Sequence, residues 1–271
     1  MPLSWFSGDV IWRRFVNGHA GDVDNRVSGL PLAPNETWVP QRDFSGGQSR
    51  GFLWLKYDVH DNVSDRVFRK DVYLGGTRFR DPGLWDGDLK RPAPKRPMPY
   101  EVTCNEQLSA AAGTQKVVRI RFSLPPDALT CSYKMYLKWA PHRDLADVID
   151  QFWNQNEHIP EPMIWYVAEA LAECGLAMEQ GGLDGPDADW DEIVHRDLKP
   201  MNVFLDAPDA RYPRYPKPLL GDFGLASKTK PNDPNNPHWY NKGEGTDGFL
   251  APEQSSWIDA QTWAPDRSSA A

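Results

Sequence analysis

The stretch EIVHRDLKPMNVFLD, residues 192–206, sets charged and amide side chains between two runs of apolar residues. Its polar members include His195, Arg196, Asp197, Lys199 and Asn202. A buried strand tolerates few such groups, whereas the flanking Ile, Val, Phe and Leu residues favour strands held in a core. The pattern predicts a polar loop fixed by the scaffold on both sides, which is how active sites are commonly built. Such a loop can hold charge and exchange protons, and the rest of the chain must show in which reaction.

The composition indicates a globular chain. With 271 residues, 40% of them hydrophobic and 25% charged, the chain could form one large domain or two small ones. The 25 prolines and 21 glycines indicate many loops. A formal net charge of −8 argues against nonspecific binding to nucleic acid or to an anionic membrane, so we expect neither as a partner.

Cysteine usage and the chain's start favour an intracellular protein. The three cysteines, Cys104, Cys131 and Cys174, lack the close spacing of a zinc site, and an odd number does not suggest a disulfide framework. The first residues show no secretory pattern, and no apolar run approaches the length of a membrane span. We expect a cytoplasmic or nuclear location.

The elements that position the polar loop change character along the chain. The expected strands occupy residues 51–60, 66–74, 116–124 and 132–140. A short helix at 100–111 interrupts them, which predicts a mostly antiparallel sheet with one inserted helix. The Pro- and Gly-rich stretch at about 75–97 is interpreted as a solvated insertion loop, and residues 1–37 as an irregular extension.

Beyond residue 140 the pattern becomes helical. We expect helices at 144–155 and 161–180. The apolar face of the second carries Met163, Val167, Ala170, Leu171, Cys174 and Met178 at helical spacing. A β-rich half followed by an α-rich half predicts the α+β class.

Three motifs occur in an order that resembles the eukaryotic protein kinases. HRDLKPMN at 195–202, DFG at 222–224 and APE at 251–253 resemble the catalytic loop, the metal-binding motif and the end of the activation segment of that family. The seven fixed letters of the first motif arise by chance on the order of once per 10⁹ positions. The phrases NVFLD and DGFLAPEQ also resemble fungal kinases.

The resemblance implies a bilobal kinase-like fold and a division of the chain. It implies an antiparallel β N-lobe with one helix at 38–137, and a hinge with a mostly α-helical C-lobe at 138–271. The activation segment would cover 222–253. Because only 18 residues follow Glu253, we expect an incomplete C-lobe, truncated after the APE motif, and an aggregation-prone chain with an uncovered helix face.

The resemblance also implies roles for the polar residues. Asp197 would accept the proton of the attacking hydroxyl, and Lys199 would meet the γ-phosphate of ATP. Asn202 and Asp222 would supply oxygen ligands to Mg²⁺. Arg196 implies control by phosphorylation of the activation segment, with Ser227, Thr229 and Tyr240 as candidate sites and Glu244 as an alternative source of the same charge.

The nucleotide-binding residues implied by the resemblance lie mostly before residue 141. Lys70, rather than Lys56 or Lys116, stands where the family has its phosphate-anchoring lysine, and Glu101 stands where its ion-pair partner is expected. The other implied residues are Gly46, Gly47 and Gly51 over the phosphates, Leu137 limiting the pocket, and the backbone near Trp139 and Ala140 facing adenine. The GGxxxG spacing of the glycines departs from the family's GxGxxG.

A Ser/Thr kinase with ATP and Mg²⁺ as cofactors and a protein substrate is the leading hypothesis, because DLKPMN and GTDGFLAPE resemble Ser/Thr rather than Tyr kinases. Three alternatives stay open: a pseudokinase acting as a nucleotide-binding or scaffold module, a small-molecule kinase, and a fragment of a longer gene product. The sequence carries no signal for an oligomeric state.

Overall fold

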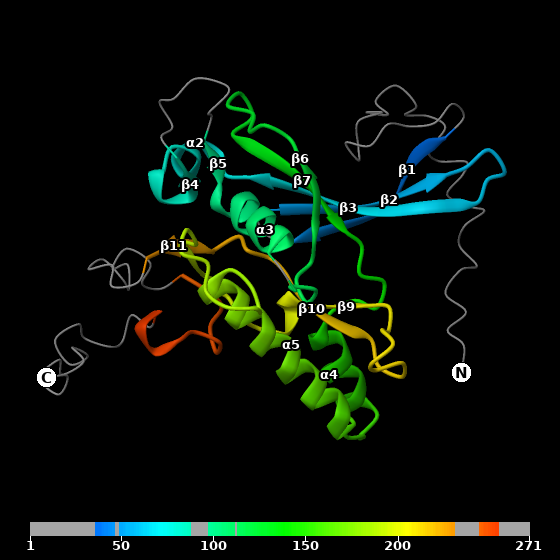
Figure 1. Cartoon of the computed structure of the whole chain (residues 1–271). Helices are drawn as coiled ribbons and strands as arrows, with labels where there is room; N and C mark the ends of the chain where they lie inside the picture. The colour runs from blue at the N-terminus through cyan, green and yellow to red at the C-terminus, as the bar shows by residue number, and fades with distance from the viewer. Residues whose placement is uncertain (1–35, 47–48, 88–96, 112, 231–243, 255–271) are drawn as a thin grey trace, which may run out of the picture. The chain divides into compact units, whose positions relative to one another are not determined.

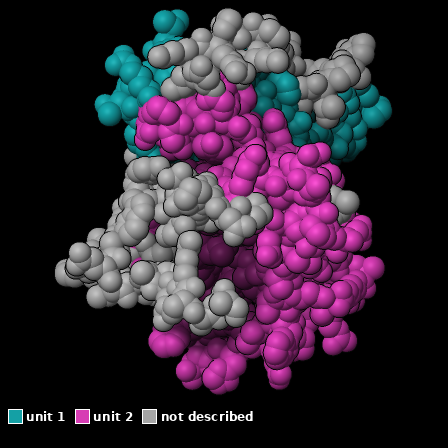
Figure 2. Space-filling model, turned by 60° about the vertical axis from the view of Figure 1, so that its left-hand side comes forward, with its two compact units in different colours: residues 1–80, 120–139 teal, residues 81–119, 140–271 magenta. Residues whose placement is uncertain are grey.

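The computed structural model describes residues 36–46, 49–87, 97–111, 113–230 and 244–254 (Figure 1). The architecture is mixed α+β, as expected. The chain divides into two compact units, coloured separately in Figure 2. Unit 1 contains residues 1–80 and 120–139, and unit 2 contains residues 81–119 and 140–271.

Unit 1 is built on a five-stranded antiparallel sheet in the order β1-β2-β3-β7-β6. Its strands are β1 (Thr37–Gly46), β2 (Ser49–Tyr57), β3 (Val63–Tyr73), β6 (Ile120–Ser123) and β7 (Ser132–Lys138). The β2–β3 turn is closed by Asp58, whose carboxylate accepts hydrogen bonds from the backbone N–H of His60 and Asn62, both at 2.8 Å. Strand β1 begins at the end of the stretch expected to be irregular, and the predicted strand at 116–124 is shortened to β6.

Side chains alternate between the two faces of this sheet, as the strand period requires. One face carries a buried cluster of Trp38, Trp54, Val67 and Tyr136. Phe68 follows Val67 directly and therefore points to the opposite face, which also carries Phe44 and Trp139.

The stretch at 75–97, interpreted above as a solvated loop, is more ordered than expected where it is described. Helix α2 (Gly75–Phe79) follows β3, and η1 (Pro82–Leu84) leads into β4 (Trp85–Asp86), which pairs with β5 (Met98–Pro99). Trp85 is buried at 3% exposure, which explains why the segment folds. The basic run at 88–96 lies outside the described residues.

Unit 2 contains the three expected helices with almost the expected bounds. They are α3 (Tyr100–Ala110), α4 (Leu145–Asn154) and α5 (Glu161–Gln180). Asp144 caps α4 by accepting a hydrogen bond from the N–H of Asp147 at 3.0 Å. Helix α5 packs against β8 (Glu192–Val194) and β10 (Lys217–Leu220).

The core of unit 2 joins α3, α5 and the segment around residue 223. Its buried members are Cys104, Leu108, Val117, Cys174, Ala177, Met178, Ile193, Leu220, Phe223 and Ala226. Burial raises the pKa of both core cysteines to about 12, so they remain neutral thiols. Both are free thiols.

Several apolar side chains of the helices are exposed. Trp153 on α4 is 82% exposed and Trp165 on α5 is 66% exposed, and Ile164 is also exposed. The sequence predicted an uncovered apolar face only on α5, and the incomplete C-lobe from which it was inferred stays a prediction. Within the described ranges, no helix combines the length and apolar character needed to cross a bilayer.

Candidate active site

Two short antiparallel pairs hold the polar loop of unit 2. Strand β8 precedes the loop and pairs with β11 (Ser227–Thr229), while β9 (Val203–Asp206) follows it and pairs with β10. The single 3₁₀ turn η2 (Pro200–Asn202) connects the loop to β9. The apolar flanks therefore fix both ends of the loop, as the sequence pattern predicts.

Asp197 lies at the centre of a hydrogen-bonded cluster. Its Oδ2 accepts hydrogen bonds from Lys199 Nζ at 2.7 Å and from Asn202 Nδ2 at 3.1 Å. Its Oδ1 accepts from the Thr246 hydroxyl at 2.7 Å, and Lys199 Nζ also donates to that hydroxyl oxygen at 2.7 Å. The structure thus brings together the three predicted catalytic residues and adds Thr246, which sequence reasoning used only to infer the substrate type.

His195 supports the cluster through both ring nitrogens. Its Nδ1 accepts a hydrogen bond from the Asp197 N–H at 3.3 Å, so Nε2 carries the proton and donates to the Gly221 carbonyl at 3.0 Å. Its ring packs against Phe223, with centroids 4.9 Å apart. Burial lowers the pKa of His195, which favours the neutral imidazole that this pattern requires.

Asp222 adjoins the same cluster through its neighbour. The Gly221 N–H donates to the Asn202 carbonyl at 2.9 Å. Asp222 itself has φ = 59°, a left-handed conformation that a non-glycine residue adopts at some cost and that is enriched at functional sites. A Cβ on Gly221 would lie 2.9 Å from both the Phe204 ring and Val118, so only glycine fits before Asp222.

The donor set of unit 2 fits a hard cation such as Mg²⁺. The Asn202 amide nitrogen donates to the Asp197 carbonyl at 2.8 Å and to its carboxylate, which leaves the amide oxygen of Asn202 available as a ligand. Asp222 supplies a carboxylate. In the described part of the chain no three His, Cys, Asp or Glu residues form a metal-binding group, so this pair would need phosphate oxygens or water to complete the coordination.

Glu101 lies in the first turn of α3 and is buried. Its carboxylate oxygen is 3.8 Å from the position that a Cβ on Gly224 would take, which places Glu101 beside the 222–224 segment within unit 2. Lys70 lies on the central strand β3 of unit 1, opposite Gly51 and Met135 in the register. The ion pair between Lys70 and Glu101 stays a prediction.

The two lysines considered instead of Lys70 have other partners. Lys56 Nζ donates to Glu36 at 3.2 Å. Lys116 is buried, donates to the Tyr166 hydroxyl at 3.1 Å and lies 3.5 Å from an Asp209 carboxylate oxygen. These contacts occupy both ammonium groups within their own units.

A second set of contacts joins the loop to the segment at 244–254. The guanidinium of Arg196 pairs with the Glu244 carboxylate at 2.5 Å. Gln254 Nε2 donates to the carbonyls of Arg196 at 2.7 Å and Glu244 at 2.9 Å, and its Oε1 accepts from the Ala251 N–H at 3.1 Å. Of the candidate phosphorylation sites, Thr229 is buried and Tyr240 lies outside the described residues.

The predicted nucleotide-side residues of unit 1 are distributed along the sheet. Gly46 pairs with Ser49 where the β1–β2 hairpin turns, and Gly47 lies outside the described residues. Leu137 is opposite Phe68 in the β3–β7 register, and Trp139 follows β7. Ala140 belongs to unit 2.

The conformation of unit 1 does not fit a nucleotide placed over Gly51. A Cβ on Gly51 would lie only 2.2 Å from Cζ of Phe68, so the ring of Phe68 lies directly on the glycine. The same ring stacks on Trp139 with centroids 6.2 Å apart. This aromatic packing, which sequence reasoning missed, supplies a structural reason for glycine at position 51.

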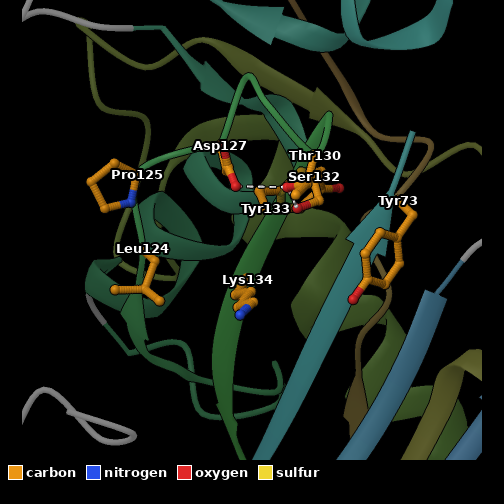
Figure 3. Close-up of a pocket in the computed structure, with 8 residues that line it drawn as sticks. All are labelled: Tyr73, Leu124, Pro125, Asp127, Thr130, Ser132, Tyr133 and Lys134. Atoms are coloured by element: carbon orange, nitrogen blue, oxygen red, sulfur yellow. Dashed lines mark hydrogen bonds between the residues drawn. The ribbon is translucent and has the colours of Figure 1, made fainter. Parts of the chain in front are cut away.

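A cavity of about 220 Å³ lies elsewhere in unit 1 (Figure 3). It is lined by Tyr73, Leu124, Pro125, Asp127, Thr130, Ser132, Tyr133 and Lys134. The Asp127 carboxylate accepts a hydrogen bond from the Thr130 hydroxyl at 2.7 Å, so this carboxylate already has a partner among the lining residues. The cavity contains none of the predicted site residues.

The motif order and the mixed α+β architecture indicate the kinase class, and comparison with known proteins confirms this. Residues 131–262 match the protein kinase domain family. The chain therefore carries protein kinase domain sequence in its second half, and its relatives are distant Ser/Thr kinases, several of them fungal.

Three relatives show how low the sequence identity is. The eIF-2-alpha kinase GCN2 of Schizosaccharomyces pombe is 28% identical over 136 residues, which cover 47% of this chain and 7% of that protein. The G2-specific protein kinase nimA of Emericella nidulans is 28% identical over 137 residues, which cover 44% of this chain and 18% of that protein. The serine/threonine-protein kinase Nek2 of Mus musculus is 27% identical over 136 residues, which cover 49% of this chain and 26% of that protein. The match thus spans about a quarter or less of each relative.

Proposed function

We propose that the chain is a protein serine/threonine kinase domain, with an N-lobe at 38–137 and a hinge and C-lobe from residue 138. In this proposal it transfers the γ-phosphoryl group of ATP to a Ser or Thr hydroxyl of a protein. The observation that carries the proposal is the cluster in which Lys199, Asn202 and Thr246 all donate hydrogen bonds to the Asp197 carboxylate.

Each residue of the cluster has a distinct role in the proposed phosphoryl transfer. Three donors fix the Asp197 carboxylate, so one lone-pair direction is left to orient a substrate hydroxyl and take its proton. Such general-base catalysis contributes about 10²- to 10⁴-fold. The Lys199 ammonium offsets negative charge at the same place. When bound, ATP supplies the phosphoryl group, and Mg²⁺ held by Asn202 and Asp222 offsets its charge.

A protein substrate is favoured by the segment at 244–254. This segment is attached to the catalytic loop through Thr246 and Gln254, so a substrate bound along it would meet Asp197. The relatives include a protein kinase named serine/threonine-protein kinase Nek2 and a G2-specific protein kinase, which supports the same substrate class.

The test uses the purified chain, labelled ATP and a generic basic protein substrate. We expect phosphate transfer to Ser or Thr that falls at least a hundredfold in Asp197→Asn, in line with about 10²- to 10⁴-fold from a general base. Asp150→Asn, an exposed carboxylate on α4, is the matched control and should leave transfer unchanged. Transfer that survives Asp197→Asn, or phosphotyrosine as the main product, would contradict the proposal.

A pseudokinase-like binding module is the second candidate. The Phe68 ring on Gly51 favours it, because a chain that never binds nucleotide has no need to keep that face open. Under this alternative, millimolar Mg·ATP leaves the melting temperature of the chain unchanged, even after the ring is removed by substitution.

A further inference from the structure

Three aromatic rings gather on one face of the sheet of unit 1. Phe44 of β1 meets Phe68 of β3 edge to face, with centroids 5.7 Å apart. Trp139, which follows β7, lies 5.7 Å from Phe44 and stacks on Phe68 at 6.2 Å. Each ring thus contacts the other two, and we name this set the aromatic triad.

The triad lies at three of the unit 1 residues that the kinase resemblance implies for the nucleotide, namely Gly51, Leu137 and Trp139. Phe68 lies on Gly51, where a Cβ would be 2.2 Å from the ring. Phe68 is also paired with Leu137 across β3 and β7. Trp139 belongs to the triad itself. A ring therefore stands where a base is expected to approach the backbone.

The space between the rings is too small for a planar base. A base stacked between two rings needs about 7 Å from plane to plane, twice the roughly 3.5 Å of an aromatic contact. The Phe68 and Trp139 rings are inclined by only 27° with centroids 6.2 Å apart, so they are already in contact with each other. A base can enter only if a ring moves.

Phe68 is the ring best placed to move. It is half-buried and lies outside the buried cluster on the other face, to which its neighbour Val67 contributes with no exposed surface. Its rotation about χ1 therefore leaves that cluster intact. Trp139 would then lose Phe68 as its stacking partner, so a planar base could stack on the indole in its place, while Phe44 keeps the Arg42 guanidinium over its ring at 4.7 Å.

We propose that Phe68 is a gate residue: its ring, closed against Phe44, Trp139 and Gly51, excludes a purine nucleotide and must swing away before the nucleotide binds. This inference rests on the proposed function, because a kinase would bind its nucleotide at the unit 1 residues that the family resemblance implies. The gate makes binding depend on a minor open conformation of unit 1.

The size of the effect follows from the population of the open conformation. Minor conformations are typically populated at about 0.1–10%. Apparent affinity is reduced by that fraction, so the closed ring weakens nucleotide binding by about tenfold to a thousandfold. Removing the ring should increase the nucleotide affinity at least about tenfold, even though the base loses one stacking partner.

The experiment measures Mg·ADP binding by isothermal titration calorimetry, since ADP avoids turnover. We expect Phe68→Ala to bind at least tenfold more tightly than the unmodified chain. Phe68→Val, which suits a strand and also vacates the ring position, should show the same direction if Phe68→Ala folds poorly. Phe52→Ala is the matched control, because Phe52 packs on the opposite face and should leave affinity unchanged.

The outcomes separate the gate from the proposed function. Equal or weaker binding by both Phe68 variants overturns the gate, as does the absence of binding in all variants. Asp197-dependent phosphate transfer measured in the unmodified chain would still support the kinase assignment in that case. Tighter binding by the variants without any phosphate transfer would support the gate and contradict the assignment.

Discussion

Gly221 offers the sharpest test of how the fold positions the active site. A methyl group at this residue would lie 2.9 Å from the Phe204 ring, which belongs to β9, and from Val118. Overpacking of this kind costs about 1–3 kcal/mol. Displacing the backbone also weakens the hydrogen bonds with His195 and Asn202, at about 0.5–1.5 kcal/mol each. We therefore expect Gly221→Ala to cost about 2–6 kcal/mol.

The matched control lies in α5. A Cβ added at Gly175 would meet no atom within 4 Å, so Gly175→Ala should stabilise the helix by about 0.5–1 kcal/mol. Urea unfolding of both variants measures the difference directly. Phosphate transfer should fall sharply in Gly221→Ala only, because Asp222 follows it. A Gly221→Ala chain that unfolds at the same urea concentration as the unmodified chain would refute the reasoning.

Three further predictions concern charge and exposure. Burial lowers the pKa of His195 below its usual 6.5, so the unfolded chain binds more protons and stability should fall as pH drops below about 6.5. Urea midpoints across this pH should show the loss, and His195→Gln should flatten it while the exposed His158→Gln does not. Cys131 should react first with a thiol reagent, and the two buried cysteines only on unfolding, because burial raises their pKa to about 12. Glu244→Gln should lower phosphate transfer several-fold by removing the charge that pairs with its arginine, whereas phosphatase treatment of the unmodified chain should not. A loss on phosphatase treatment would contradict the last prediction.

The sequence predicted the elements with strong local signals. Helix α5 was predicted at its observed bounds because its apolar residues recur at helical spacing along its length. The polar loop and its flanking strands were predicted because a run of charged residues between β-formers is rare in a core. These signals act over short stretches of chain, so one sequence is sufficient to read them.

The missed features depend on residues far apart in the chain. Thr246 lies 49 residues from Asp197, and no local pattern indicates their hydrogen bond. The packing of Phe68 on Gly51 requires the register of β2 against β3, which strand patterns alone do not supply. The order around Trp85 was missed because Pro and Gly suggested a loop, whereas burial of the indole ring stabilises the segment.

The way the chain is shared between the two units constrains how it can be made and divided. The chain passes from one unit to the other at 80/81, 119/120 and 139/140. During synthesis β3 can pair with β7 only after the whole of α3 has been made, because Tyr73 pairs with Ser132 and α3 lies between them in the chain. A cut at 139/140 keeps unit 1 on one fragment but leaves α3 apart from the rest of its core, and a cut between residues 81 and 119 separates β6 and β7 from the other strands of the sheet. No single cut therefore separates the two units from each other with both intact.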